Sequence, residues 1–175
     1  MTVLTERKKA RFISGDTECA AWHYPGTNGA CVIMAGGGAV TKEPGTDLFA
    51  RRFHEAGFNV LAFDYRRLGE SGGQPRQVIH IREQLTDWQA AIAFAAGLPG
   101  VDPARLAIWG FSLSGGHVFR VAADNPQLAS AIAQTPTARP PRATRRVTRS
   151  RSRCCVSPAG APSMLSAASW AGRPC

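Results

Sequence analysis

Short apolar runs alternate with segments of helical periodicity through the first three quarters of the chain. The apolar runs are 30–35 (ACVIMA), 59–63 (NVLAF), 105–109 (RLAIW) and 128–133 (LASAIA). An apolar run of this length, bounded by turn residues, is typical of a strand that is buried on both faces of a parallel sheet. We therefore predict four such strands.

The longest helical pattern lies between the second and third of these runs. Its apolar residues, spaced 4, 3, 4 and 3 apart, are Ile81, Leu85, Trp88, Ile92 and Ala95. This spacing places them on one stripe of a helix, and we expect Arg82, Glu83 and Asp87 to point away from that stripe.

Three weaker patterns complete the predicted order of elements. Apolar residues from about Leu48 to Ala56 predict a helix that ends at Gly57, and 115–123 predicts another. Runs 11–14 and 19–24 flank Gly15-Asp16 and predict an antiparallel hairpin. Because strands and helices then alternate with short connections, we predict an α/β fold over 1–136, with a mostly parallel sheet and antiparallel lead-in strands.

A candidate nucleophile follows the third apolar run, in Gly110-Phe111-Ser112-Leu113-Ser114-Gly115-Gly116. A G-x-S-x-G turn between a strand and a helix is sharp and strained, so small residues must flank the serine. Gly110, Ser114, Gly115 and Gly116 meet this need, although Ser114 replaces the motif's last glycine. We expect Ser112 to stand exposed at the carboxyl end of the sheet. The alternative is a Gly/Ser-rich turn without chemistry.

Four segments together resemble the α/β-hydrolase superfamily, nearest to its bacterial dienelactone-hydrolase-like and acyl-peptidase-like branch. They are the first buried strand with Gly36-Gly37-Gly38, the run 63–73 (FDYRRLGESGG), the helix around Trp88, and the Ser112 turn. The resemblance covers about residues 9–136. It implies an incomplete α/β-hydrolase fold and a serine hydrolase that acts on a small-molecule ester or amide through an acyl-enzyme on Ser112, without a cofactor.

The resemblance also implies an oxyanion hole. Gly36 stands where the family commonly has histidine, and the backbone N–H groups of Leu113 and Gly38 are expected to hold the oxyanion. The sequence leaves Ala39 open in place of Gly38. We assign the loop 69–72 a structural role behind the Ser112 turn.

Trp88 and Phe111 could line an acyl pocket. Aromatic residues at these spacings are more often part of the core, so we favour a core role for both.

The remaining catalytic residues do not follow in the family's order, which is serine, then acid, then histidine. Beyond Ser112 the only acid is Asp124 and the only histidine is His117, and both fall on the helix after the serine. His23, His54 and His80 lie on the lead-in strand and on or beside helices. We therefore assign no triad acid and no triad base, and expect this chain to be inactive.

The charge of +9 is concentrated in the last part of the chain. All twelve acidic residues lie between Glu6 and Asp124, where the net charge is +1, whereas 137–175 holds eight Arg and no Lys, Asp or Glu. We expect a disordered tail there. Its composition fits a GC-rich gene read in a shifted frame, so we expect a frameshift near Thr137 that removed the family's acid, base and last strands. The strand 128–133 would then form an exposed apolar edge.

Two other functions can be formulated. The segment 145–153 (RRVTRSRSR) resembles an arginine/serine-rich RNA-binding segment, although we expect any nucleic-acid binding by it to be non-specific. Gly36-Gly37-Gly38 followed by a strand ending at Asp64 is reminiscent of a dinucleotide site, but Pro44 interrupts the pattern and Asp64 lies too far along the chain.

Other features exclude further classes. The five cysteines, at 19, 31, 154, 155 and 175, form no metal-binding spacing. No apolar run is long enough for a signal peptide or a membrane span, so we expect a cytoplasmic protein that does not bind membranes.

Overall fold

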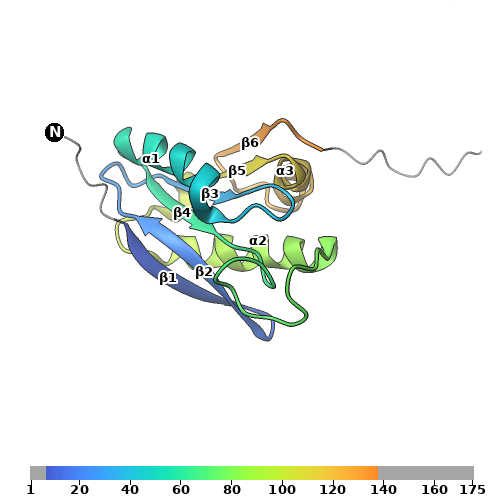
Figure 1. The fold of residues 1–175 in the computed structure, drawn as a ribbon. Helices are drawn as coiled ribbons and strands as arrows, with labels where there is room; N and C mark the ends of the chain where they lie inside the picture. The colour runs from blue at the N-terminus through green and yellow to red at the C-terminus, as the bar shows by residue number, and fades with distance from the viewer. Residues whose placement is uncertain (1–6, 138–175) are drawn as a thin grey trace, which may run out of the picture. The chain divides into compact units, whose positions relative to one another are not determined.

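The structure is a computed structural model that describes residues 7–137 and shows a mixed six-stranded sheet with helices on both faces (Figure 1). The strands are β1 (Lys8–Ser14), β2 (Thr17–Tyr24), β3 (Cys31–Ala35), β4 (Asn59–Phe63), β5 (Leu106–Phe111) and β6 (Ser130–Gln134). The helices are α1 (Asp47–Glu55), α2 (Ile81–Ala96) and α3 (Leu113–Asp124), with short helical turns at Lys42–Thr46 and Pro103–Arg105.

The sheet has the strand order β1-β2-β4-β3-β5-β6. Strands β4, β3, β5 and β6 run parallel, and the β1–β2 hairpin joins β4 in antiparallel orientation. Gly15, with φ +62°, makes the hairpin turn that pairs Ser14 with Thr17. The predicted α/β class, its mostly parallel sheet and the antiparallel lead-in strands are therefore confirmed.

Two apolar layers cover the sheet because alternate residues of β3 and β4 point to opposite faces. Ile33 and Leu61 pack with the apolar face of α2 and with α3, and Trp88 is fully buried in this layer. Val32 and Val60 pack on the other face with Ala50 of α1. Both faces of these central strands are covered, which explains their continuous apolar sequences.

The predicted stripe of α2 needs two corrections, of which the first is that Ile81, at the start of the helix, is 46% exposed. Trp88, Ile92 and Ala95 are buried as expected, but Asp87 is also buried, with an exposed fraction of 0%. Its carboxylate accepts hydrogen bonds from the backbone N–H and the Nε–H of Arg66, at 3.0 and 2.8 Å. The prediction that Asp87 points away from the core was wrong because a basic side chain from the loop after β4 neutralises it there.

Helix α1 also differs from its predicted pattern. Leu48 is 67% exposed, while Asp47 and Ala50 face the sheet. The carboxylate of Asp47 accepts a hydrogen bond from the Tyr24 hydroxyl and forms an ion pair with Arg7. The buried side of α1 therefore combines the polar contact of Asp47 with Ala50 and with Phe53, which is partly buried against the same apolar layer.

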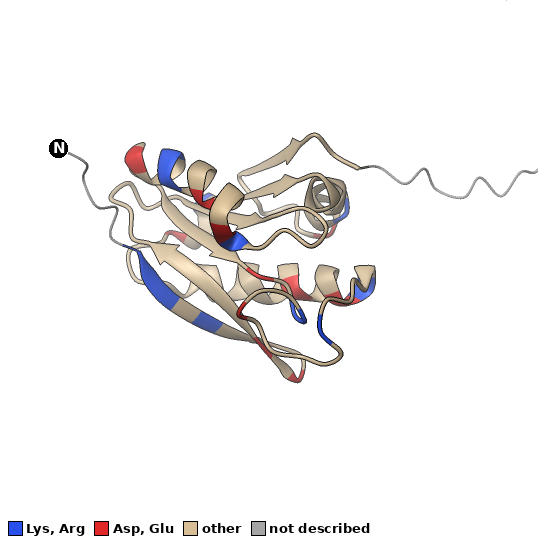
Figure 2. Ribbon diagram, viewed as in Figure 1, with Lys and Arg blue, Asp and Glu red and all other residues tan. Residues whose placement is uncertain are grey.

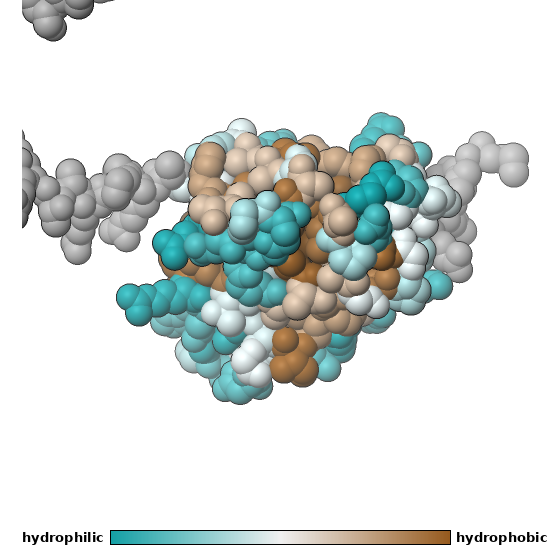
Figure 3. Space-filling view, turned by 180° about the vertical axis from the view of Figure 1, so that it is seen from behind, coloured by the Kyte–Doolittle hydropathy of each residue, from teal (hydrophilic) through white to brown (hydrophobic). Residues whose placement is uncertain are grey.

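Strand β6 lies at the edge of the described sheet and pairs there with β5. Ile132 on this strand is 39% exposed, and the view from behind shows apolar surface between the polar patches (Figure 3).

The predicted tail lies almost entirely outside the described residues. Among residues 7–137, no helix is both long and apolar enough to cross a membrane.

Candidate functional site

Ser112 occupies a sharp turn between β5 and α3. Its backbone has φ +54° and ψ −112°, in the left-handed half of φ that non-glycine residues rarely adopt. Backbone hydrogen bonds hold the turn, mainly to β6 and the residues after it: the N–H of Ser112 donates to Gln134 (3.0 Å), and its C=O accepts from Gly116 (3.0 Å) and Thr137 (2.9 Å). The structure thus has the strained strand–turn–helix geometry predicted for Ser112.

Close backbone contacts explain the small residues around this turn. A Cβ atom on Gly110 would lie 2.3 Å from the carbonyl oxygen of Ser114, and one on Gly116 would lie 2.4 Å from that of Thr137. A Cβ on Gly115 would lie 2.9 Å from the carbonyl oxygen of Gln134. A larger residue would displace main-chain atoms at each of these positions.

The loop after β3 meets the Ser112 turn at the carboxyl end of the parallel strands. A Cβ on Gly37 would lie 3.1 Å from the Cβ of Ser112, and one on Gly38 would lie 3.9 Å from the Cβ of Leu113. Outside the regular elements, no backbone hydrogen bond among residues 7–137 uses the N–H of Gly38 or Leu113 as donor. The two expected oxyanion donors therefore come from segments in direct contact. Ala39 follows with φ +58°.

The only acid and the only histidine that follow Ser112 in the chain are engaged elsewhere. His117 is buried, its Nε2 lies 2.9 Å from Oε1 of Gln84, and burial lowers its pKa below the usual value. Asp124 pairs with Arg120 at 2.6 Å on the surface. Asp124 ends α3, roughly 18 Å along the helix axis from Ser112 at about 1.5 Å per residue. Neither residue is placed as a triad partner.

The hydroxyl of Ser112 has a different neighbour. Its Oγ lies 3.3 Å from Oγ1 of Thr137, a residue that follows β6 and is exposed. The three remaining histidines lie on other elements: His23 in β2, His54 in α1 and His80 at the start of α2. Burial lowers the pKa of His23, which is an interior strand residue.

A buried ion pair fixes the far end of the loop after β3. Nζ of Lys42 lies 2.9 Å from Asp64 and 2.6 Å from Glu70. The backbone N–H of Lys42 also donates to Asp64, at 2.6 Å. Burial opposes the charge on Lys42, but its hydrogen bonds to the two acids outweigh this effect and raise its pKa. Asp64 is therefore a buried structural residue, unavailable to a ribose.

The loop 69–72 is also structural, but it does not pack behind the Ser112 turn as expected. Ser71 is buried; its hydroxyl donates to the carbonyl of Asp64 (2.6 Å) and accepts from the N–H of Ala20 in β2 (2.8 Å). The N–H of Gly72 donates to Glu18, also in β2. The loop therefore joins β4 to the lead-in hairpin, because β2 is the strand next to β4.

The two aromatic candidates for an acyl pocket have separate positions. Trp88 belongs to the core beneath the sheet, as favoured, where its ring meets Phe63 edge-on. Phe111 is partly buried and lines an apolar cavity of about 150 Å³ on the α1 side, together with Val40, Gly45, Thr46, Phe49 and Trp109. Within residues 7–137, none of the contacts of this cavity assigns it to an acyl group.

The described residues also contain a hydrogen-bond chain that sequence patterns did not predict. Nε1 of Trp88 donates to the Tyr65 hydroxyl at 2.8 Å, and that hydroxyl lies 2.5 Å from Oγ of Ser114. Ser114 in turn donates to the carbonyl of Gly36. The one signal in the sequence was the serine at the motif's last position, where small size alone would favour glycine.

The free thiols of Cys19 and Cys31 are buried, and burial raises the pKa of each to about 12. Residues 7–137 contain no cluster of three or more His, Cys, Asp or Glu side chains arranged to hold a metal ion.

Comparisons with known proteins agree with this geometry. Quorum-quenching protein AidA of Acinetobacter baumannii strain MDR-ZJ06 is 46% identical over 129 residues, which cover 72% of this chain and 42% of AidA. The crystal structure of the α/β hydrolase GrgF from Penicillium sp. sh18 matches with a TM-score of 0.72 and 29% identity, over 75% of this chain and 46% of GrgF. Protein PA2218 of Pseudomonas aeruginosa matches with a TM-score of 0.73 and 28% identity, over 78% and 45%.

The chain spans less than half the length of each of these three proteins. Its residues 26–161 match the family described as serine aminopeptidase, S33 (Hydrolase_4). This range includes β3 to β6, the Ser112 turn and residues 137–161 of the Arg-rich tail. The resemblance to α/β hydrolases is thereby confirmed, and the chain belongs to the S33 serine aminopeptidase family of the α/β-hydrolase superfamily.

Proposed function

We propose that this chain carries the nucleophile of a serine hydrolase of esterase or acyl-peptidase type, and that Ser112 is that nucleophile. The observation that carries the proposal is the strained backbone of Ser112 at the carboxyl end of β5, where α3 begins. Such a turn holds a hydroxyl away from the backbone so that it can reach a substrate carbonyl. In the proposed reaction, Oγ bonds to the carbonyl carbon, and the alcohol or amine leaves with the proton.

The oxyanion formed in that step needs two N–H donors aimed at it. Leu113, at the positive N-terminus of α3, would supply one, and Gly38, which lies close to Leu113, would supply the other. Support for this pair comes from their proximity and from the lack of competing backbone acceptors in the described residues. The substrate class proposed is an ester or amide, and no cofactor is needed for this chemistry.

We further propose that this chain alone does not turn over substrate. The Ser112 hydroxyl faces Thr137 instead of an imidazole, and a serine without a base is a weak nucleophile. We expect the full chain to hydrolyse p-nitrophenyl acetate no faster than its Ser112→Ala variant, when the release of p-nitrophenol is followed at pH 8.

The matched control for this assay is Ser130→Ala, which removes an exposed hydroxyl from the edge strand β6. Turnover that Ser130→Ala retains and Ser112→Ala loses would disprove the proposed inactivity, while supporting the nucleophile assignment.

Non-specific binding of nucleic acid is a second proposed property, carried by the eight Arg in 137–175. Acidic and basic residues are interspersed over the described part of the chain (Figure 2). The amino-acid sequence places the excess positive charge in 137–175. If the tail contacts six or more phosphates, affinity for random-sequence DNA should fall about 10³-fold between 50 and 200 mM salt. Binding that resists salt and selects a sequence would show specific recognition instead. A chain ending at Thr137 is the control.

A further inference from the structure

We propose that Ser114 and Tyr65 are positioning residues, whose buried hydroxyls hold the loop Gly36–Gly38 in register with the Ser112 turn. The inference rests on the proposed function, because that loop matters only if it contributes an oxyanion donor. It assigns a role to two side chains that do not touch substrate.

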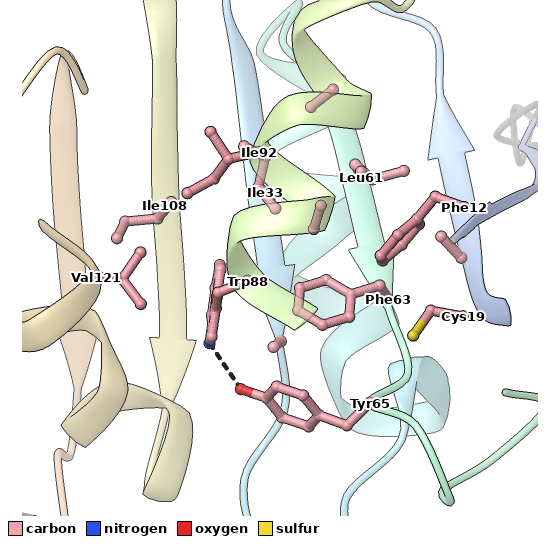
Figure 4. Packing of buried hydrophobic residues seen from close by; sticks show 14 of the residues in the cluster. Phe12, Cys19, Ile33, Leu61, Phe63, Tyr65, Trp88, Ile92, Ile108 and Val121 are labelled. Atoms are coloured by element: carbon pink, nitrogen blue, oxygen red, sulfur yellow. Dashed lines mark hydrogen bonds between the residues drawn. The ribbon is translucent and has the colours of Figure 1, made fainter. Parts of the chain in front are cut away.

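The two ends of the hydrogen-bond chain fix its direction. The indole N–H of Trp88 can only donate, and the carbonyl of Gly36 can only accept. The Tyr65 hydroxyl therefore accepts from Trp88 at 2.8 Å, as Figure 4 shows, and donates to Ser114 at 2.5 Å. The Ser114 hydroxyl donates its own hydrogen bond to the carbonyl of Gly36. Every member of the chain thus has a single assigned direction.

Burial protects this hydrogen-bond chain from competition by water. Trp88 and Ser114 have exposed fractions of 0% and Tyr65 has 1%. Hydrogen bonds in such surroundings are stronger than in water and reinforce one another along a chain. Burial also raises the pKa of Tyr65, so its hydroxyl keeps the proton that it donates.

The hydrogen-bond chain connects the two segments that would form the oxyanion hole. Its origin, Trp88, lies in α2, whereas Ser114 lies in the first turn of α3, two residues after the nucleophile. Its end, Gly36, is the residue at which β3 gives way to the loop. Gly37 and Gly38 lie so near Ser112 and Leu113 that a Cβ added to either glycine would touch them, so a shift of the Gly36 carbonyl would move the loop's donor relative to the nucleophile. Misplacement by about 1 Å is enough to impair such a site severely.

This role also explains why serine occupies the last position of the motif. The steric needs of the turn are met at Gly110, where an added Cβ would lie 2.3 Å from Ser114's own carbonyl. At 114 itself, glycine would be small enough, but the Tyr65 hydroxyl would lose its acceptor and the Gly36 carbonyl would lose the hydroxyl that donates to it. A buried polar group that loses its hydrogen-bond partner lowers the stability of the fold, so the hydroxyl at position 114 is needed to satisfy these two groups.

The test uses the full chain and measures amide hydrogen exchange and indole signals by NMR. The reporter is the N–H of Val40, which donates to the carbonyl of Gly37 at 3.2 Å. The internal reference is the N–H of Lys42, which is anchored by Asp64. In Tyr65→Phe and in Ser114→Ala, we expect Val40 to exchange about tenfold faster relative to Lys42, the size expected for losing one buried hydrogen bond.

A spectroscopic signal separates this role from general loosening. In Tyr65→Phe, the indole proton of Trp88 should move upfield because its acceptor is gone, and in Ser114→Ala it should move less in the same direction. The matched control is Ser71→Ala, which removes another buried hydroxyl with two hydrogen bonds but none to the loop 36–38. It should leave the Val40 ratio and the Trp88 signal unchanged.

An unchanged Val40 ratio in both variants would overturn the inference, as would the same increase in Ser71→Ala. If one of the two variants fails to fold, the other decides. Hydrogen exchange and the indole signal can be measured without catalysis. A failure of Ser112 to act as a nucleophile would therefore be detected separately from a failure of the positioning role.

Discussion

Replacing Gly110 with alanine is expected to lower the free energy of unfolding by about 3 kcal/mol, at the upper end for overpacking, because the clash is with backbone. The added Cβ would lie 2.3 Å from the carbonyl oxygen and 2.5 Å from the carbonyl carbon of Ser114. Neither atom can move without opening the turn that holds Ser112. Urea denaturation followed by circular dichroism measures the effect.

The control is Gly45→Ala, because among the described residues no atom beyond Gly45 and its chain neighbours lies within 4 Å of a Cβ placed there. Gly45 lies in the turn before α1, and its replacement should change the free energy of unfolding by no more than about 1 kcal/mol. Equal unfolding midpoints for the two variants would mean that the strand-to-helix turn is less tightly packed than the structure shows.

Replacing Asp87 with alanine is expected to destabilise the chain by about 3–5 kcal/mol, because it leaves a buried cation without its partner. The Arg66 side chain is only 10% exposed and pairs with the fully buried Asp87 at 2.8 Å. Two further hydrogen bonds join Arg66 to Ser14 of β1, so the pair connects three segments. Thermal and urea unfolding both report the change.

The comparison is Asp124→Ala, which removes the acid of a surface pair with Arg120 in α3. Exposed i, i+4 pairs contribute about 0.3–0.5 kcal/mol, so this variant should unfold close to the wild-type midpoint. If Asp87→Ala were as mild as Asp124→Ala, the Arg66–Asp87 pair could not be a principal tie between the hairpin, α2 and the loop after β4.

The elements most completely predictable from the sequence were those whose residues face one environment along their whole length. The strand 59–63 has the predicted bounds because all five of its residues are buried. The Ser112 turn was predictable because backbone crowding restricts its neighbours to small residues. Both signals are local, and each depends on residues within one short segment.

Long-range polar contacts were not predictable in this way. Periodicity predicts that Asp87 lies on the surface, yet Asp87 is buried because it pairs with Arg66, which lies 21 positions earlier in the sequence. The same holds for Lys42 with Asp64, and for Tyr65 with Ser114. Which charged or hydroxyl groups meet depends on the order of strands in the sheet, and that order is not encoded in any one segment.

The most direct test of the central claim, that Ser112 is a hydrolase nucleophile, uses a hybrid in which residues 26–137 replace the aligned segment of AidA. The hybrid is treated with a fluorophosphonate that labels unmodified AidA, and the tryptic peptide 106–120 (LAIWGFSLSGGHVFR) is sequenced by mass spectrometry. We predict an adduct on Ser112 that is absent from the Ser112→Ala hybrid. Labelling at another residue, or none when AidA itself is labelled, would contradict the account.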